Sequence, residues 1–416
     1  MPEQDLNPSI VFVTQGYPPI EGGVSTSTQR VAQNLVKRGC RVIVLSLDYS
    51  RPLSEQDYVI SENDEGVEIR RVGPFFKGRV INDETIATHR RRIFDQMELV
   101  AQDFDPDLVL SFFAASPGLL AAYLAHSIGC PHVVSLRGND IGRNIFSMNW
   151  IAALSLIVNG SARIACVNEH LRRRLLLAFP KALPQSVIIA NGVELPRGLS
   201  RDYSRAYIKR KAGWTSSDIV VVFLGTLREK KGALLLLRAF ESICQDIPLR
   251  LLIVGPELGD DERLQGGQIW DSLKGDGFLH VTGQLSRTEA LLIAGEGDII
   301  VMPSIDDGMA NSLLEGMLLG LCPVVSDLFA DIVVAGECGW VTARNDLESL
   351  TSALLEAASS SDQRSRFGRA ARARVGNCYT AKREAEAYLE LFREVLRDAP
   401  PRKIINCAKP GDSDLS

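Results

Sequence analysis

Short apolar runs recur along the whole chain, and helical patterns of apolar spacing separate most of them. In the first half the predicted strands are 10–14, 41–47, 67–72, 108–112, 132–136, 163–167 and 187–190. In the second half they are 219–224, 251–255, 299–302 and 322–326, with shorter segments at 278–284 and 339–341. Strands that are apolar on both faces are typical of parallel sheets covered by helices. The order of elements therefore predicts an α/β protein with two doubly wound sheets.

One strand, loop and helix in the second half carry the clearest chemical signal. Residues 299–302 predict a buried strand, residues 303–308 a turn, and residues 311–319 a helix. A helix that starts at the carboxyl end of a parallel strand offers free backbone N–H groups to an anion such as a diphosphate. Asp307 in the loop and Glu315 about one turn into the helix could both reach a ligand held there. The alternative is a capped, solvated helix start without a ligand.

Glycines or charged residues follow other predicted strands, where ligand-binding loops of a parallel sheet belong. These residues are Gly22 and Gly23, Arg137 and Asp140, and Arg228 and Lys231. Glycine lets the backbone come close to a ligand, and basic residues ahead of a helix suit a diphosphate. Each pair also has a purely structural interpretation, as a mobile turn, a surface ion pair or solvated basic side chains.

The composition, with 45% hydrophobic and 23% charged residues, is that of a soluble globular protein. A net charge of −5 gives no general attraction to nucleic acid. The eight cysteines are scattered without a Cys-x-x-Cys pair, and the five histidines show no metal-ligand spacing. The first residues lack the basic and apolar regions of a signal peptide. We therefore expect a cytoplasmic protein with reduced cysteines, no bound metal and no nucleic-acid partner.

Two features bear on contact with a membrane. The uncharged run 108–125 is long enough to span a bilayer, but Pro117 and Gly118 interrupt it, so a strand followed by a helix is predicted instead. Basic residues cluster at 89–92 and at 172–174, and the second cluster precedes an apolar helical segment. Such a helix could lie on an anionic bilayer, although a run of charges is usually a solvated face. Peripheral contact with the inner face of a membrane stays open.

The segment from Asp307 to Glu315, a carboxylate with a glutamate eight positions later, resembles the donor-site signature of the retaining nucleotide-sugar glycosyltransferases of family 4. Other elements resemble that family in the same order, namely Gly22-Gly23, Asn191-Gly192-Val193 and Lys231-Gly232. The resemblance covers nearly the whole chain. It implies the GT-B fold, in which two Rossmann-like, doubly wound domains face a central cleft.

That fold implies a division of the 416-residue chain. We expect an N-terminal acceptor-binding domain over 1–195, a linker over 196–217 and a C-terminal donor-binding domain over 218–379. A helix over 380–398 would cross back to the first domain. The last segment, 399–416, is rich in Pro, Gly and Asp, which is typical of disorder.

The resemblance also implies roles for residues of the donor site. Arg228 and Lys231 would grip the diphosphate of the donor. Glu315 would accept hydrogen bonds from the ribose hydroxyls, and Asp307 would hold hydroxyls of the donor sugar. Further donor-binding residues implied in this way are Gly22, Gly23, Thr282, Leu285, Gly308, Met309, Ala310, Asn311 and Ser312.

Three positions depart from the family pattern. Arg137 stands where His is common, Thr226 where Arg is usual, and Asp307 where Glu is usual. Arg228, two residues beyond Thr226, is expected to supply the missing positive charge. Arg137, Asp140 and Asp307 are the residues that the resemblance implies for catalysis, and Arg137 brings a fixed positive charge in place of a neutral hydrogen-bonding group.

The implied activity is the metal-independent transfer of a hexosyl or N-acetylhexosaminyl group with retention of configuration. The donor would be a nucleoside-diphosphate sugar, more often UDP-linked than GDP-linked, and the acceptor a hydroxyl of a glycan, a lipid or a small natural product. No cofactor beyond this co-substrate is implied. A same-face reaction, in which the leaving phosphate takes the acceptor proton, is expected, and double displacement stays open.

Two other functions compete with glycosyl transfer. A GT-B nucleotide-sugar epimerase would need further acid and base groups around the sugar, and the few histidines argue against it. A non-catalytic nucleotide-sugar binding protein is favoured by the three departures. It would bind nucleotide sugars and release no nucleotide with any acceptor.

Overall fold

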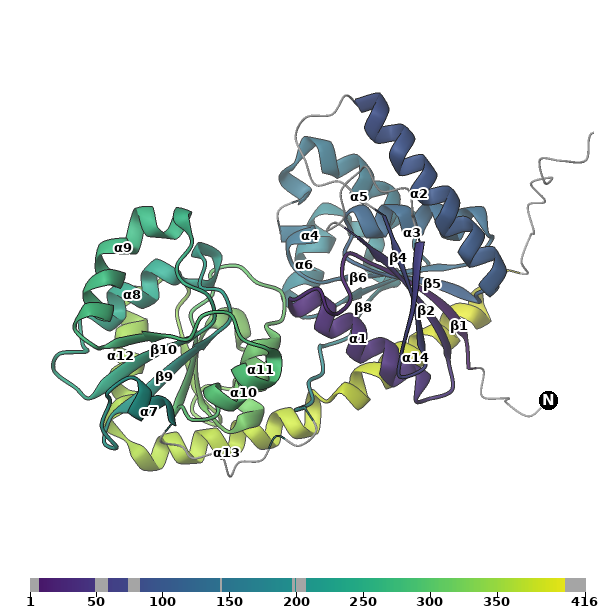
Figure 1. Cartoon of the computed structure of the whole chain (residues 1–416). Coiled ribbons are helices and arrows are strands. Elements are labelled where there is room, and N and C mark those ends of the chain that lie inside the picture. Colours follow the sequence, from purple (N-terminus) through teal and green to yellow (C-terminus); the bar gives the residue numbers. More distant parts are fainter. Residues whose placement is uncertain are drawn as a thin grey trace, which may run out of the picture. The chain divides into compact units, whose positions relative to one another are not determined.

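The computed structural model describes residues 7–48, 59–73, 83–142, 144–196, 199 and 207–400. The chain forms two compact units, Met1–Ala190 with Glu384–Ser416, and Asn191–Arg383. Each unit is built around one sheet with helices against it (Figure 1). The chain therefore passes between the units twice, after Ala190 and before Glu384.

The first sheet has eight strands among the described residues, in the order β3-β4-β2-β1-β5-β6-β7-β8. Their bounds are β1 (Ser9–Thr14), β2 (Arg41–Leu47), β3 (Val59–Asp64), β4 (Val67–Val72), β5 (Leu108–Phe112), β6 (His132–Leu136), β7 (Arg163–Cys166) and β8 (Ser186–Ile188). The hairpin β3–β4 is antiparallel, and the other described pairs are parallel. The doubly wound arrangement predicted from the apolar runs is confirmed.

Strand β3 was not predicted from the sequence. It is an edge strand, and its residues Ser61, Glu62 and Asn63 are exposed. An edge strand needs no apolar pattern because one side and much of its surface face solvent. The sequence therefore lacks the apolar run by which the other strands are recognised.

Helices cover both faces of the first sheet. They are α1 (Gly23–Val36), α2 (Asp83–Phe104), α3 (Ser116–Ser127), α4 (Asn139–Gly142), α5 (Met148–Gly160) and α6 (Glu169–Ala178), with the 3-10 turns η1 (Asn144–Phe146) and η2 (Pro180–Gln185). Alternate residues of β1 serve two cores: Phe12 packs in the cluster that contains Leu35 of α1, and Val13 in the cluster that contains Met97 of α2. This alternation explains why every residue of β1 from Ile10 to Val13 is apolar.

The uncharged run 108–125 forms strand β5 and most of helix α3, as predicted. No helix in the described part of the chain is long and apolar enough to cross a membrane. In α6, the Arg172 and Arg173 guanidinium groups lie 3.5 and 3.3 Å from the Glu169 carboxylate. Part of this basic cluster is thus neutralised within its own helix, and membrane contact stays a prediction.

The last helix, α14 (Ala381–Asp398), returns to the first unit from Glu384 onward. Tyr388 and Phe392 are fully buried in the same core as Phe12. The Tyr388 hydroxyl donates a hydrogen bond of 2.8 Å to Ser135 Oγ at the end of β6. A segment distant in sequence thus completes the first core.

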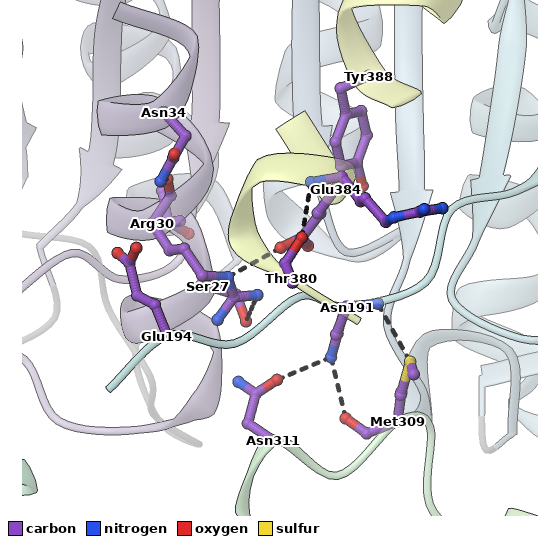
Figure 2. A network of polar contacts seen from close by, with 12 residues as sticks. Ser27, Arg30, Asn34, Asn191, Glu194, Met309, Asn311, Thr380, Glu384 and Tyr388 are labelled. Carbon is purple, nitrogen blue, oxygen red and sulfur yellow. Dashed lines mark hydrogen bonds and ion pairs between the residues drawn. The ribbon is translucent and has the colours of Figure 1, made fainter. Parts of the chain in front are cut away.

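A buried ion pair fixes this helix at its start in the first unit. Arg30 Nε of α1 donates to Glu384 Oε2 at 2.8 Å, and the two side chains are 4% and 1% exposed (Figure 2). Arg137 Nη1 lies 3.9 Å from Glu384 Oε1. Glu384 therefore balances positive charge from two elements of the first unit, in surroundings that exclude water.

The second sheet contains six described strands in the order β11-β10-β9-β12-β13-β14. They are β9 (Ile219–Leu224), β10 (Leu249–Val254), β11 (Leu279–Val281), β12 (Ile299–Met302), β13 (Cys322–Ser326) and β14 (Trp340–Thr342), and all described pairs are parallel. Counted from β9, this is the Rossmann order 3-2-1-4-5-6. The strand order reverses between β9 and β12, and ligands of such sheets bind at the carboxyl ends of the strands at that point.

The helices of the second unit are α7 (Tyr207–Lys211), α8 (Ala233–Glu241), α9 (Asp260–Gly275), α10 (Arg287–Ala294), α11 (Asn311–Leu319), α12 (Leu347–Ser359) and α13 (Ser361–Cys378), with the 3-10 turns η3 (Glu229–Lys231) and η4 (Asp327–Phe329). Helix α9 begins at Asp260, in a polar segment for which the apolar pattern of the sequence predicted no helix. Acidic residues in its first turn favour a helix start. Gly266 packs within the helix, where a Cβ would lie 3.1 Å from the Leu237 side chain.

The units divide after Ala190 and before Glu384, whereas the sequence placed domain ends at 195 and 379. Segment 191–196 belongs to the second unit, and the predicted linker 196–217 contains α7.

Among the described cysteines, Cys40, Cys166 and five others are free thiols. The expected disorder of the tail concerns residues that lie, from 401 onward, outside the described residues.

Replacing Glu384 with Gln tests the buried ion pair. Removing one partner leaves Arg30 and Arg137 without a buried counter-charge, which costs about 3–5 kcal/mol in comparable pairs. We expect a drop of several degrees in the unfolding temperature of the first unit, measured by calorimetry on the full chain. The matched control is Glu386→Gln on the same helix, because Glu386 is half exposed and lies 3.4 Å from Arg38. Equal, small shifts for both variants would contradict the account.

Candidate functional site

The loop that follows β9 presses directly against the end of β12. Gly232 has a φ of 78°, and a Cβ added there would lie 2.3 Å from the Pro303 carbonyl oxygen. The backbone N–H groups of Ile305 and Asp306 donate to the Lys230 carbonyl at 2.8 and 3.1 Å. Glycine is required at Gly232 by both its conformation and this close approach. The two loops at the switch point of the sheet therefore form one interlocked structure.

Lys231 is half-buried in this structure. Its Nζ lies 5.9 Å from the centre of the Phe223 ring, and the described residues offer it neither a hydrogen bond nor an ion pair. Burial lowers the pKa of Lys231, the Asp307 carboxylate opposes that change, and Lys230 and Arg228 add to it. A desolvated ammonium without a paired anion is costly unless a ligand supplies the opposite charge. The site is thus suited to an anion.

Helix α11 begins at Asn311, at the end of the loop whose Ile305 and Asp306 contact the Lys230 carbonyl. Its N-cap residue, Ala310, makes no side-chain cap hydrogen bond in the described structure. The first N–H groups of a helix have no partner within the helix, and the dipole there favours negative charge. Asn311 and Ser312, which the sequence analysis singled out, form this first turn. A second anion-favouring element therefore follows the same loop.

Asp307 lies at the same loop and is mostly buried, with its side chain 17% exposed. Its Oδ1 accepts a hydrogen bond of 2.9 Å from the Gly308 N–H and lies 4.0 Å from Lys230 Nζ. Arg228, by contrast, is exposed. The structure therefore brings Asp307, Gly308 and Lys231 together at the switch point, and leaves Arg228 at its solvent side.

The segment Met309–Asn311 is held by a residue that the sequence analysis treated only as a boundary. Asn191 Nδ2 donates to the Met309 carbonyl at 3.0 Å and to Asn311 Oδ1 at 2.9 Å, and the Asn191 N–H lies 3.1 Å from Met309 Sδ (Figure 2). Next to it, a Cβ on Gly192 would lie 2.2 Å from the Thr380 carbonyl oxygen. The candidate loop is thus fixed where the chain enters the second unit.

Glu315 is 8% exposed on the second turn of α11. Its partner is Arg287, whose Nε and Nη2 lie 2.9 and 2.7 Å from Glu315 Oε1. A role for Arg287 was not predicted from the sequence. The available signal was Ser286-x-x-Glu289, a capping box that marks the start of α10 and places Arg287 on its first turn.

The loop after β11 lies at the same edge of the sheet. Thr282 donates through its N–H to the Ile253 carbonyl at 3.0 Å, and Thr282 Oγ1 accepts from the Gly255 N–H at 3.2 Å. These bonds fix the loop against the end of β10. Leu285 is half-buried just before α10. Thr282 and Leu285 therefore follow β11, two strands away from β9. They precede α10, whose Arg287 contacts Glu315.

In the first unit, the predicted catalytic residues Arg137 and Asp140 are interior residues. The Arg137 guanidinium lies 4.1 Å from the centre of the Phe112 ring, and its side chain is 5% exposed. Asp140 is 1% exposed and accepts hydrogen bonds from four backbone N–H groups, including that of Ala114 at 3.2 Å and that of Gly138 at 2.8 Å. Burial raises the pKa of Asp140, against the effect of these donors.

These contacts show that Asp140 holds the loops after β5 and β6 together, and that Arg137 is engaged with Glu384 and Phe112. Their catalytic role stays a prediction.

Gly22, with a φ of 134°, precedes α1, which begins at Gly23. A Cβ on Gly22 would meet no atom within 4 Å, so space beside this turn is open.

Two family models match the chain in succession. The model "Glycosyltransferase Family 4" matches residues 21–197, and the model "Glycosyl transferases group 1" matches residues 204–374. Together they span both compact units. The second match contains every residue described above at the ends of β9, β11 and β12.

Relatives of known sequence are glycosyltransferases. The chain is 24% identical over 336 residues to TuaC of Bacillus subtilis, which is named as a teichuronic acid biosynthesis glycosyltransferase, with 77% of this chain and 81% of that protein covered. It is 25% identical over 338 residues to an uncharacterized glycosyltransferase of Methanocaldococcus jannaschii, with 77% and 80% covered.

Solved structures share the fold. Sucrose-phosphate synthase from Thermosynechococcus elongatus superposes with a TM-score of 0.77 at 16% identity, covering 93% of this chain and 98% of that one. HepE of Anabaena, in a complex with UDP-glucose, superposes with a TM-score of 0.74 at 14% identity, covering 93% and 100%. At these identities the likeness concerns the fold.

Proposed function

Because the chain is a family 4-like glycosyltransferase with the GT-B fold, we propose that it moves a hexosyl or N-acetylhexosaminyl group from a nucleoside-diphosphate sugar to a hydroxyl acceptor. The observation that carries this proposal is the half-buried, unpaired ammonium of Lys231, whose loop contacts the loop that leads to the start of α11. Both favour negative charge, and they lie at the switch point of a Rossmann sheet.

The diphosphate would occupy this point. Lys231 offers a point charge, and the first N–H groups of α11 offer directed donors. Arg228, which is exposed in the structure, would turn toward the phosphates when they bind. These groups would stabilise the charge that develops on the leaving diphosphate, so we propose that no metal ion is needed for that purpose.

The sugar and the ribose would lie on either side of the diphosphate. The Asp307 carboxylate lies 4.0 Å from the Lys230 ammonium, and we assign it to hydroxyls of the donor sugar. Glu315 faces the start of α10 and accepts from Arg287, and we assign it to the ribose. The base would lie along Thr282 and Leu285. UDP is our expected nucleotide, and the named UDP-glucose complex of the structural neighbour HepE is in keeping with it.

We propose transfer with retention of configuration. In the same-face reaction, the bond between the sugar carbon and the leaving phosphate oxygen breaks while the acceptor oxygen bonds to that carbon on the same face. The acceptor's proton passes to the leaving phosphate oxygen, so no enzymic base is needed. The acceptor class, whether glycan, lipid or small natural product, is left open by this proposal.

A thermal-shift panel tests the donor assignment. Ligand that binds only the folded protein raises the unfolding temperature by mass action. We expect one of UDP, GDP and ADP, with its sugar conjugates, to raise it, and we expect the shift to persist in EDTA. A shift that EDTA abolishes would contradict metal independence. Absence of a shift with all of these ligands would contradict the donor site, and binding without nucleotide release in an acceptor panel would favour the non-catalytic alternative.

The lowered pKa of Lys231 leads to a second prediction, which concerns the pH dependence of nucleoside-diphosphate binding. A bound diphosphate restores the charged form, so binding takes up a proton once the pH exceeds the pKa of the free site, which lies below the usual value of 10.5. Nucleoside-diphosphate affinity should therefore fall as pH rises toward 10.5, measured by isothermal titration calorimetry.

Lys231→Ala should bind at least about tenfold more weakly near neutral pH, because a charge-assisted bond is lost, and should show no such alkaline fall. The control is Lys274→Ala, since the Lys274 ammonium is exposed and paired with Glu257 at 2.6 Å. An alkaline fall that is unchanged in Lys231→Ala would overturn this assignment.

A further inference from the structure

Arg287 is a charged residue of the second unit to which neither the sequence nor the reaction above assigns a role. It contacts two segments at once: Nε and Nη2 lie 2.9 and 2.7 Å from Glu315 Oε1, and Nη2 donates to the Glu194 carbonyl at 2.8 Å. We propose that Arg287 is a positioning residue that orients Glu315 for the ribose of the donor. This inference rests on the proposed function.

The two contacts with Glu315 converge on a single oxygen. Oε1 receives both Nε and Nη2, and Oε2 has no hydrogen-bond partner among the described residues. An ionised carboxylate can accept at each oxygen, so Oε2 keeps its capacity for a ligand. Vicinal hydroxyls of a ribose are donors that match it. Arg287 thus fixes one oxygen of Glu315 and leaves the other for the nucleotide.

Glu315 needs such a partner because of where it lies. It is 8% exposed and sits among the buried residues Leu313, Leu314 and Gly316 of α11. An ionised carboxylate in these surroundings is costly unless it is paired and hydrogen-bonded. A cation that held both oxygens would satisfy the charge and block the ligand. The geometry found here satisfies the charge through Oε1 alone.

Arg287 is itself held firmly, which a positioning residue requires. The capping box at the start of α10 has both of its bonds, from the Glu289 N–H to Ser286 Oγ and from the Ser286 N–H to Glu289 Oε2. The bond to the Glu194 carbonyl adds an anchor on the other side. The guanidinium is therefore fixed by its own helix start and by segment 191–196.

The planar guanidinium group, with several N–H donors in fixed directions, suits Arg287 to this role. Two N–H groups of Arg287 reach one carboxylate oxygen while one of these nitrogens also reaches a backbone carbonyl. A lysine ammonium is a single point of charge on a flexible stem and could not make the same planar set of bonds. Arg287→Lys should keep a positive charge beside Glu315, unlike Arg287→Gln, and should orient the Glu315 carboxylate only in part.

The experiment compares ribose with deoxyribose. Affinities of UDP, GDP and ADP and of their 2′-deoxy forms are measured by isothermal titration calorimetry on the wild-type chain and on Arg287→Gln and Arg287→Lys. We expect the wild type to prefer the ribonucleotide of its own base by about tenfold, as for loss of a hydrogen bond to a charged group. In Arg287→Gln the ribonucleotide should lose this advantage, while the affinity for the 2′-deoxy form changes little. Arg287→Lys should lie between the two.

The matched control is Arg250→Gln. Arg250 Nη2 lies 3.0 Å from Asp218 Oδ1, and both residues are near the amino ends of β9 and β10, at the opposite edge of the sheet from the site. This variant should keep the ribose preference. Unfolding temperatures of all variants show whether each is folded at the temperature of the titration.

The outcomes separate the inference from the function on which it rests. A wild type that prefers the ribonucleotide, with an equal preference in folded Arg287→Gln, would overturn the role of Arg287 and leave the donor site intact. An equal loss of affinity for both forms in Arg287→Gln would mean that Arg287 supports the fold of the site without orienting Glu315, and would also overturn the inference. A wild type that binds none of the nucleotides would overturn the proposed function together with it.

Discussion

The half-buried ammonium of Lys231 is the physical constraint around which the second unit is arranged. Taking a positive charge out of water without pairing it is costly, and the lowered pKa of Lys231 expresses that cost. The surrounding structure nevertheless keeps the lysine there, because Gly232 brings its loop against the Pro303 carbonyl and the Lys230 carbonyl accepts from two N–H groups of the β12 loop. Such an arrangement favours a negatively charged ligand over an empty site.

Buried polar contacts also hold the loop before α11 and the last helix, α14. Asn191 holds Met309 and Asn311 where the chain enters the second unit, and Glu384 holds α14 where it returns to the first. Both segments in which the chain passes between the units are therefore fixed by buried polar contacts on the unit they join. A site built from short loops needs such support, because loops carry few apolar contacts of their own.

The sequence predicted most of the architecture because strands buried on both faces leave continuous apolar runs. It missed β3, whose exposed edge position requires no apolar pattern, and the first half of α9, which is mostly polar. Asp307 and Glu315 could be proposed together as site residues because they belong to one local motif. Arg287 was missed, because the capping box Ser286-x-x-Glu289 marks only the start of α10, and a contact with the second turn of α11 leaves no spacing in the sequence. For the same reason the interior position of Arg137 could not be foreseen.

A comparison of nucleotides with one and two phosphates tests most directly whether the switch point of the second sheet binds a diphosphate. Isothermal titration calorimetry on the wild-type chain would compare the nucleoside diphosphate with the monophosphate of the same base. We expect the diphosphate to bind at least about tenfold more tightly, because in the proposed site Lys231 and the start of α11 would contact only the phosphates. Equal affinities would mean that these groups do not hold the diphosphate, and would contradict the account.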